Sequence, residues 1–314
     1  MEQASLPPPD DILDLQVNGY AGVDFNNGAT TPNEMHEACR RLREDGVKHI
    51  LATIITDDVG SMAARLASLA AFRRQDPLVE QVVLGFHIEG PFISPLPGYF
   101  GTHPAAAIRP ADSDAMKRLL DAAEGLARIV TLAPEYDEGF RVVRLLDRAG
   151  VVAAAGHCNP SVDELRGAID AGLSMFTHFG NGCPAVLPRH DNIIERVLGL
   201  ADRLFVSMIA DGAHVPFVAM RNYLRLIPAD RVVIVSDAIN AAGCGPGTYA
   251  IGDQVVEVGD DLIPRTPDRS SLAGSACTMR RMADHLQREL GVDANDLRRW
   301  MVENPRRAIG ESAA

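Results

Sequence analysis

Residues 82–90 read VVLGFHIEG, a short apolar run that ends in histidine, glutamate and glycine. Apolar runs of similar length recur along the chain, with amphipathic stretches between them. They cover residues 12–18, 48–56, 127–135, 151–159, 174–181, 204–212 and 231–238. Short buried runs that alternate with helical stretches are typical of a parallel sheet covered by helices. Eight such units predict an α/β fold, a (β/α)8 TIM-type barrel, whose main rival is an open doubly wound sheet.

The segments between the runs read as helices, several of them opened by Ser, Asn or Pro and closed by Gly. Helices are predicted at 32–45, 61–75, 113–124, 138–149, 161–171, 192–200 and 216–226. After the last run a Gly- and Pro-rich excursion predicts a hairpin insertion at 243–263, and further helices follow at 271–290 and 293–308. We expect residues 1–314 to form a single barrel domain.

The composition narrows the class of partner. The chain has 314 residues, of which 46% are hydrophobic and 23% charged, and its formal net charge is -12. This acidic balance argues against nucleic acid or an anionic membrane as a partner, because both select basic surfaces. No signal peptide and no apolar run of about 20 residues is apparent. Five scattered cysteines without C-x-x-C spacing favour a reducing cytoplasm.

Reactive side chains gather where the predicted strands end. Glu89, His157 and His178 end three of the runs, and Asp237 ends the last one. Barrel enzymes place their active sites at the carboxyl ends of the strands. A single buried histidine is more often structural, but a buried glutamate is costly unless a cation or hydrogen bonds compensate for its charge. One carboxylate and two histidines suit a divalent metal that keeps an open position for water.

Several motifs together resemble the N-acetylglucosamine-6-phosphate deacetylases of the amidohydrolase superfamily, from Asp14 to Gly310. In chain order they are DLQVNGYAGVDF, GFHIEGPFISP, GTHPA, AGHCNPSVDEL, THFGN, ADGAHV, VSDA, SLAGSACTM and NPRRAIG. Each piece alone is weak, whereas the ordered set is specific. The resemblance implies a metal-dependent amidohydrolase that hydrolyses the acetamide of N-acetylglucosamine 6-phosphate, or a close N-acetylhexosamine phosphate, to the amino sugar phosphate and acetate.

The same resemblance assigns roles at the metal. It implies that Glu89, His157 and His178 hold one divalent ion, with Zn²⁺ favoured and Fe²⁺ also tolerated by this ligand set. It makes Asp237 the catalytic acid and base, and His103 the group that polarises the substrate carbonyl. Many amidohydrolases bind a second metal with His-x-His on the first strand. Here Gln16 and Asn18 stand at those positions, which predicts a vacated second-metal position.

The substrate contacts come from later segments. The resemblance implies phosphate contacts from Asn181, the backbone of Gly182, His214, and Arg189 reaching in from a neighbouring subunit. A homodimer is implied if Arg189 acts across a subunit interface. Arg189 can grip a phosphate through two hydrogen bonds, although an exposed loop arginine is more often simply solvated.

Departures from the family pattern keep two alternatives open. Family members usually have a small β-sandwich domain, which we expect this chain to lack. The loop at 91–103 carries Tyr99 and Phe100, and a Gly-Cys pair follows Asn181. An amidohydrolase acting on a different, unphosphorylated N-acyl substrate is therefore one alternative. A non-catalytic metal-binding protein is the other, but a passive metal site would not need Asp237 as a proton shuttle.

Overall fold

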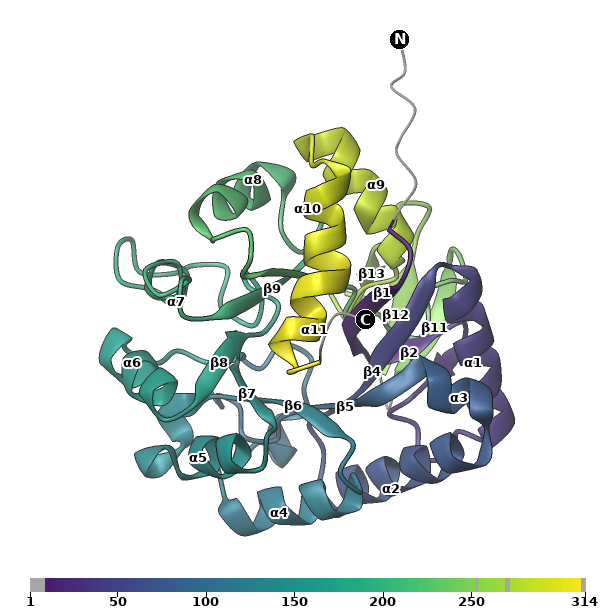
Figure 1. Ribbon diagram of the computed structural model, residues 1–314, viewed down its shortest axis with the longest axis horizontal. Coiled ribbons are helices and arrows are strands. Elements are labelled where there is room, and N and C mark those ends of the chain that lie inside the picture. Colours follow the sequence, from purple (N-terminus) through teal and green to yellow (C-terminus); the bar gives the residue numbers. More distant parts are fainter. Residues whose placement is uncertain (1–8, 252–253, 269–271, 312–314) are drawn as a thin grey trace.

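A computed structural model describes residues 9–251, 254–268 and 272–311 (Figure 1). Its centre is an eight-stranded parallel sheet in which strands follow one another in chain order. The strands are β1 (Ile12–Val17), β4 (Val47–Ile55), β5 (Val83–Glu89), β6 (Ala127–Leu132), β7 (Val152–Ala155), β8 (Leu173–Phe176), β9 (Phe205–Ile209) and β10 (Val232–Val235). All eight predicted strands are confirmed, and so is the (β/α)8 barrel.

The barrel closes between its first and last strands through a short seam rather than a full ladder. Val17 and Ala238 form an isolated parallel bridge, and the N–H of Asn18 donates to the carbonyl of Ala238 at 2.7 Å. Lower in the seam, the N–H of Ser236 donates to the Asp14 carboxylate at 3.1 Å. A side chain therefore replaces a backbone acceptor at this point of the closure.

Helices surround the strands on the outside (Figure 1). They are α1 (Pro32–Glu44), α2 (Val59–Gln75), α3 (Pro77–Val82), α4 (Ser113–Ala122), α5 (Arg141–Arg148), α6 (Val162–Asp170), α7 (Ile193–Leu198), α8 (Phe217–Leu226), α9 (Met279–Leu290), α10 (Ala294–Arg298) and α11 (Asn304–Ala308). A π-helical turn, η4 (Arg299–Glu303), joins the last two. The Asn304 side chain donates to the carbonyl of Val232 at 2.7 Å, which fastens this final helical unit over the seam.

Three helices begin two or more residues away from the predicted start, and local backbone chemistry explains two of these differences. The helix predicted from 138 begins at Arg141, because Gly139 and Phe140 have positive φ and the preceding residues form 3-10 turns, η2 (Pro134–Tyr136) and η3 (Glu138–Phe140). The helix predicted from 271 begins at Met279, where Thr278 caps it; residues 269–271 lie outside the described ranges. The helix predicted from 61 already begins at Val59.

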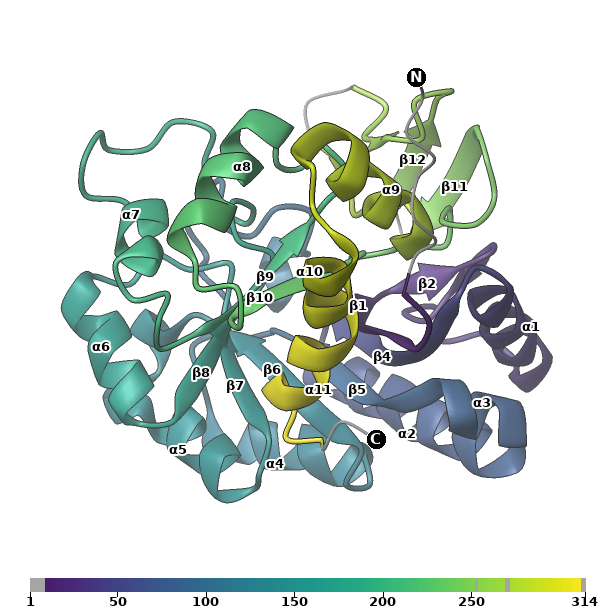
Figure 2. The same ribbon diagram turned by 45° about the horizontal axis from the view of Figure 1, so that its top comes forward.

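Two small antiparallel pairings lie outside the barrel sheet. Strands β2 (Gly19–Tyr20) and β3 (Val23–Asp24) form a short pair after β1. Strands β11 (Gly247–Ile251), β12 (Gln254–Val258) and β13 (Pro264–Arg265) form a three-stranded sheet in the region of the expected hairpin. Figure 2 shows this sheet at the periphery of the barrel, on the same side as α1.

The seam carboxylate makes folding stability depend on pH. Burial raises the pKa of Asp14 to about 7, against hydrogen bonds from the Ser236 and Gln16 backbone that lower it. The folded protein then holds a proton that the unfolded chain releases above about pH 4, so stability falls as pH rises from about 4 to 7. The loss amounts to roughly 4 kcal/mol above pH 7.

Replacing Asp14 with Asn should remove this dependence, because the amide oxygen can still accept both N–H groups. We expect the melting temperature of Asp14→Asn to exceed that of the wild type by a margin that widens from pH 5 to pH 8. Thermal unfolding of both proteins across this range measures the margin. A margin that stays constant with pH would contradict the assignment.

Candidate metal centre and active site

The side chains of the candidate centre come from the carboxyl ends of three barrel strands. Glu89 is the last residue of β5, while His157 and His178 each come two residues after the ends of β7 and β8. His157 and His178 have φ of 50° and 32°. Non-glycine residues are uncommon in this left-handed region, and such conformations concentrate at functional sites.

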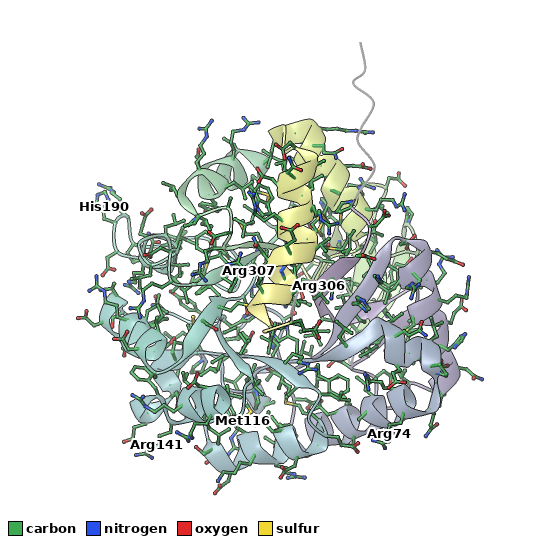
Figure 3. The ribbon with its side chains drawn as sticks, in the orientation of Figure 1. Arg74, Met116, Arg141, His190, Arg306 and Arg307 are labelled. Carbon is green, nitrogen blue, oxygen red and sulfur yellow. The ribbon has the colours of Figure 1, made fainter. Side chains whose placement is uncertain are left out.

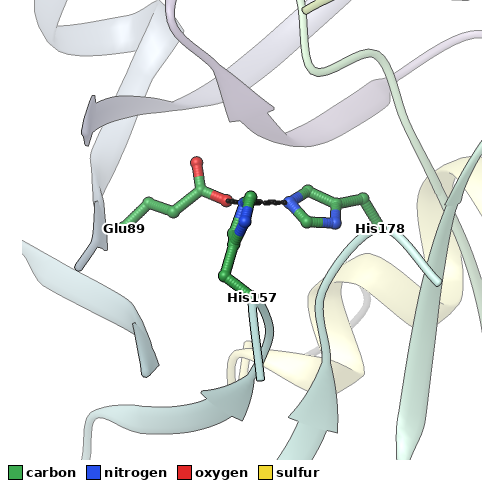
Figure 4. Close-up of side chains that lie close together, drawn as sticks. All are labelled: Glu89, His157 and His178. Atoms are coloured by element: carbon green, nitrogen blue, oxygen red, sulfur yellow. Dashed lines mark hydrogen bonds and ion pairs between the residues drawn. The ribbon is translucent and has the colours of Figure 1, made fainter. Parts of the chain in front are cut away.

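These three side chains converge on one point (Figure 4). Nε2 of His178 lies 2.9 Å from Oε1 of Glu89 and 3.0 Å from Nε2 of His157. Nε2 of His157 lies 3.3 Å from Oε1 of Glu89, so the three atoms form a small triangle. All three residues are buried. The ligand atoms of a tetrahedral zinc ion with bonds of about 2.1 Å lie roughly 3.4 Å apart. The donor set and its spacing therefore fit a divalent ion, as the sequence predicted.

The charge on Glu89 is compensated within the cluster. Burial alone would raise the pKa of this carboxyl, but hydrogen bonds and charge from His157 and His178 outweigh it and hold the pKa well below its usual range. The group is therefore an anion at neutral pH. A carboxylate must be an anion to ligate a metal, and Glu89 meets this requirement.

Asp237 faces the cluster from the end of β10, and the two amides of β1 hold it. Its Oδ1 accepts hydrogen bonds from Nε2 of Gln16 at 3.0 Å and from Nδ2 of Asn18 at 2.8 Å. Nε2 of Gln16 also lies 3.2 Å from both oxygens of Glu89. Among the described residues no donor contacts Oδ2 of Asp237. One oxygen of the carboxylate is thus anchored, and the other is free to meet a reactant.

The surroundings of Asp237 also change its pKa. Burial and the nearby charge of Glu89 raise the pKa of Asp237, and the charges of His178 and His214 only partly oppose the rise. A carboxylate with a raised pKa is a stronger base than one in water. This is the property that a group accepting a proton during hydrolysis needs.

His103 lies beside the cluster, its ring centroid 4.5 Å from that of His157. Burial lowers its pKa to about 3, so the ring is neutral. Nδ1 is 2.8 Å from Oγ1 of Thr56, a residue that sequence reasoning did not single out although it also ends a strand run. The single Thr56 hydroxyl hydrogen has two acceptors within reach, His103 Nδ1 and, at 3.2 Å, the Glu89 carbonyl. When it goes to Nδ1, at the shorter distance, Nε2 carries the hydrogen and can donate to a carbonyl.

The residues expected at the phosphate are only partly brought together. The buried Nδ2 of Asn181 has no hydrogen-bond partner in the part of the chain that the structure describes, and Gly182 packs against the His157 ring. His214 is held by Asp211, whose Oδ2 lies 2.7 Å from its Nδ1. Arg189 is exposed on the loop that also carries His190, which Figure 3 places at the outer edge of the molecule. Within one chain Arg189 therefore does not join the centre.

Orphaned polar atoms line the centre. Oε1 of Gln16, Oδ1 of Asn18 and Nδ1 of His178 are buried and have no hydrogen-bond partner among the described residues. Buried polar atoms are normally satisfied, so such a group indicates that a polar ligand or water belongs there. His87 differs from them, because both of its ring nitrogens are bonded, to Leu15 and to Thr131, which makes it a structural residue beneath the centre.

Comparisons with known proteins identify the family of this chain. No family model matches the sequence. The N-acetylglucosamine-6-phosphate deacetylase of Bacillus subtilis is 30% identical over 303 residues, which cover 95% of this chain and 74% of that protein. The human protein of the same name is 33% identical over 313 residues, 95% of this chain and 73% of that one. The chain belongs to the N-acetylglucosamine-6-phosphate deacetylase family. It is therefore a hydrolase of the amidohydrolase superfamily.

A solved structure of the family has the same fold. The Mycobacterium smegmatis N-acetyl-D-glucosamine-6-phosphate deacetylase, in a mutant form bound to N-acetyl-D-glucosamine 6-phosphate, matches with a TM-score of 0.86 and 30% identity over 98% of this chain and 78% of that chain. An N-acetylgalactosamine-6-phosphate deacetylase of Escherichia coli O157:H7 is also related, at 28% identity over 95% of this chain and 77% of that protein. The family thus includes proteins named for two amino sugar phosphates. The expected absence of a β-sandwich remains a prediction.

Proposed function

We propose that this protein hydrolyses the acetamide of N-acetylglucosamine 6-phosphate and releases acetate and the amino sugar phosphate. The observation that carries the proposal is the juxtaposition of the Glu89, His157 and His178 triangle with a carboxylate, Asp237, that has one oxygen anchored and one free. The names of the relatives support the substrate class.

The residues divide the work of hydrolysis among them. A divalent ion held by Glu89, His157 and His178 would supply water activation and polarisation of the carbonyl. Asp237 accepts the proton of the attacking water through Oδ2 and then delivers it to the departing amine, which would otherwise have to leave as an anion. His103, neutral and placed beside His157, donates Nε2–H to the carbonyl oxygen as negative charge develops there.

We propose one Zn²⁺ per chain, although the ligand set also tolerates Fe²⁺. Nε2 of Gln16 and Nδ2 of Asn18 both donate hydrogen bonds to the carboxylates of the centre. An amide N–H group cannot ligate a cation. These N–H groups stabilise the negative charge of the two carboxylates, which a second ion would otherwise compensate. This supports the interpretation of the β1 end as a vacated second-metal position.

The substrate experiment compares acetate release from N-acetylglucosamine 6-phosphate, N-acetylgalactosamine 6-phosphate and unphosphorylated N-acetylglucosamine. We expect the first to react fastest, with kcat/KM at least about 100-fold above that of the unphosphorylated sugar, because charge-assisted contacts to phosphate are worth a few kcal/mol. Equal rates with and without phosphate would favour the alternative N-acyl substrate. No acetate from any of the three, with metal present, would overturn the proposal.

Two further parts of the proposal concern assembly and location. A homodimer in which Arg189 reaches the partner's site is supported by its exposure and by Val186 in the same loop, whose side chain is 87% exposed. Sedimentation of the protein as a monomer would contradict it.

The five cysteines are free thiols, which supports a reducing cytoplasm. In the described ranges no helix has the length and apolarity that a membrane span requires.

A further inference from the structure

His157 is enclosed by two loops, the aromatic loop (residues 91–103) and the cysteine loop (residues 179–191). From the aromatic loop, the carbonyl of Tyr99 lies 2.6 Å from Nδ1 of His157, and the N–H of Ser94 donates to the His157 carbonyl at 2.9 Å. From the cysteine loop, Gly182 packs on the ring: a Cβ there would lie 3.0 Å from Nδ1. Neither loop leaves the imidazole free to turn.

The contact with Tyr99 also fixes which nitrogen carries the hydrogen. A backbone carbonyl can only accept a hydrogen bond, so Nδ1 of His157 is the donor. In the neutral ring Nε2 then keeps its lone pair, and Nε2 is the atom that lies 3.0 Å from His178 and 3.3 Å from Glu89. The backbone of the aromatic loop therefore prepares His157 for metal binding through the atom that faces the centre.

The two loops also touch each other next to this hydrogen bond. Gly98 has φ of +86°, and a Cβ at Gly98 would lie 2.8 Å from Cγ and 3.0 Å from Cβ of Pro184 in the cysteine loop. Real Cβ atoms essentially never approach another heavy atom at the shorter distance. The place of the Tyr99 carbonyl is thus set by how closely Gly98 sits on Pro184.

We propose that Gly98 and Tyr99 are positioning residues for the metal ligand His157, and that Pro184 holds them in place from the opposite loop. The inference rests on the metal centre of the proposed function. Groups that bond the outer nitrogen of a metal-ligating histidine commonly change metal affinity by about 10- to 100-fold when they are lost. Because the bond here uses a backbone carbonyl, no side-chain replacement at Tyr99 removes it, and the test must act on the loop.

The test compares Gly98→Ala with the control Gly125→Ala. Gly125 has φ of +77°, and in the described part of the chain no atom would lie within 4 Å of its Cβ, so the control adds the same methyl group and a similar backbone strain in open space. Zn²⁺ affinity is measured by competition with a chromophoric chelator, and the visible spectrum of the Co²⁺-loaded protein reports the ligand field. We expect Gly98→Ala to lose about 10-fold or more in affinity and to shift the spectrum, and the control to stay within about twofold.

A third variant tests the route through Pro184. Pro184→Gly added to Gly98→Ala removes the two side-chain atoms that the new methyl group would meet, so at least about threefold of the lost affinity should return. Unchanged affinity and spectrum in Gly98→Ala, with or without a lower melting temperature of the metal-free protein, would overturn the inference. So would a double variant that recovers nothing. If the wild type itself binds no metal, the proposed metal centre fails instead, which keeps the two failures distinct.

Discussion

Replacing Asp237 with Asn is expected to lower kcat by about 1,000-fold or more while leaving metal binding intact. The amide is nearly the same size as the carboxyl, and its oxygen can still accept the hydrogen bonds from Gln16 and Asn18 that hold Oδ1 now. What it cannot do is accept a proton at the position of Oδ2. The substitution therefore removes the proton transfer and little else. Acetate release under saturating substrate, with metal content measured on the same sample, checks the prediction.

The matched control for this variant is Asp14→Asn. It makes the same change in a buried aspartate that bonds the backbone at Ser236 and, among the described residues, has no hydrogen bond to the side chains of the centre. We expect its kcat to stay within about threefold of the wild type, since general acid–base catalysis depends on contact with the reacting atoms. Loss of activity in both variants to the same degree would show that any neutral side chain in this region disturbs the site, and would remove the special role of Asp237.

Replacing Glu89 with Gln should have the second large effect, a loss of metal affinity of about 100-fold or more with a parallel loss of activity. Glu89 supplies the only negative charge of the three predicted ligands, and its oxygens accept hydrogen bonds from Gln16 and His178. Glutamine keeps one acceptor and adds a donor that would face Nε2 of Gln16, also a donor. Metal content after dialysis, followed by activity at increasing Zn²⁺ concentration, measures both effects.

Glu135 offers the control for that change. It is a largely buried glutamate just after β6, and burial raises its pKa to about 7 even though the N–H of Asn159 donates to its Oε1. Glu135 is not among the predicted ligands, and the oxygen of glutamine can still accept the N–H of Asn159, so Glu135→Gln should leave metal content unchanged. Full metal content and activity in Glu89→Gln would be incompatible with Glu89 as a ligand.

The barrel was predictable because its signal is spread over the whole chain. Eight apolar runs, each followed by a helical stretch, agree on one architecture, and an error in one of them does not change it. The short helix α3 was not predicted: Asp76 ends α2 and also caps α3, so a six-residue element lies directly behind a long one. The start of α9 shifted because residues around Ser275 form a bridge to Ala238 in place of helix.

The centre was predictable to the extent that it uses side chains at strand ends. Glu89, His157 and His178 meet as expected, because parallel strands in a barrel bring their carboxyl ends to one rim. Contacts made by backbone atoms do not depend on residue type and leave no pattern in the sequence. The hydrogen bond between the Tyr99 carbonyl and His157 could therefore not be predicted. Nor does the sequence show that one amide, that of Gln16, bridges two carboxylates, since this depends on how the barrel closes.

The left-handed backbone at His157, His178 and Asp237 has a consequence for how this protein can change. Each residue occupies a conformation that glycine or asparagine adopts more easily, at a cost on the order of 1 kcal/mol or more. Glycine has no side chain to ligate a cation, and asparagine replaces an imidazole ligand with a weakly binding amide and cannot carry the proton of Asp237. Random mutation selected for thermostability alone would thus favour inactive variants at these positions, Asp237→Asn among them. Stability and activity are opposed at the same three residues, so gains in robustness must come from elsewhere in the barrel.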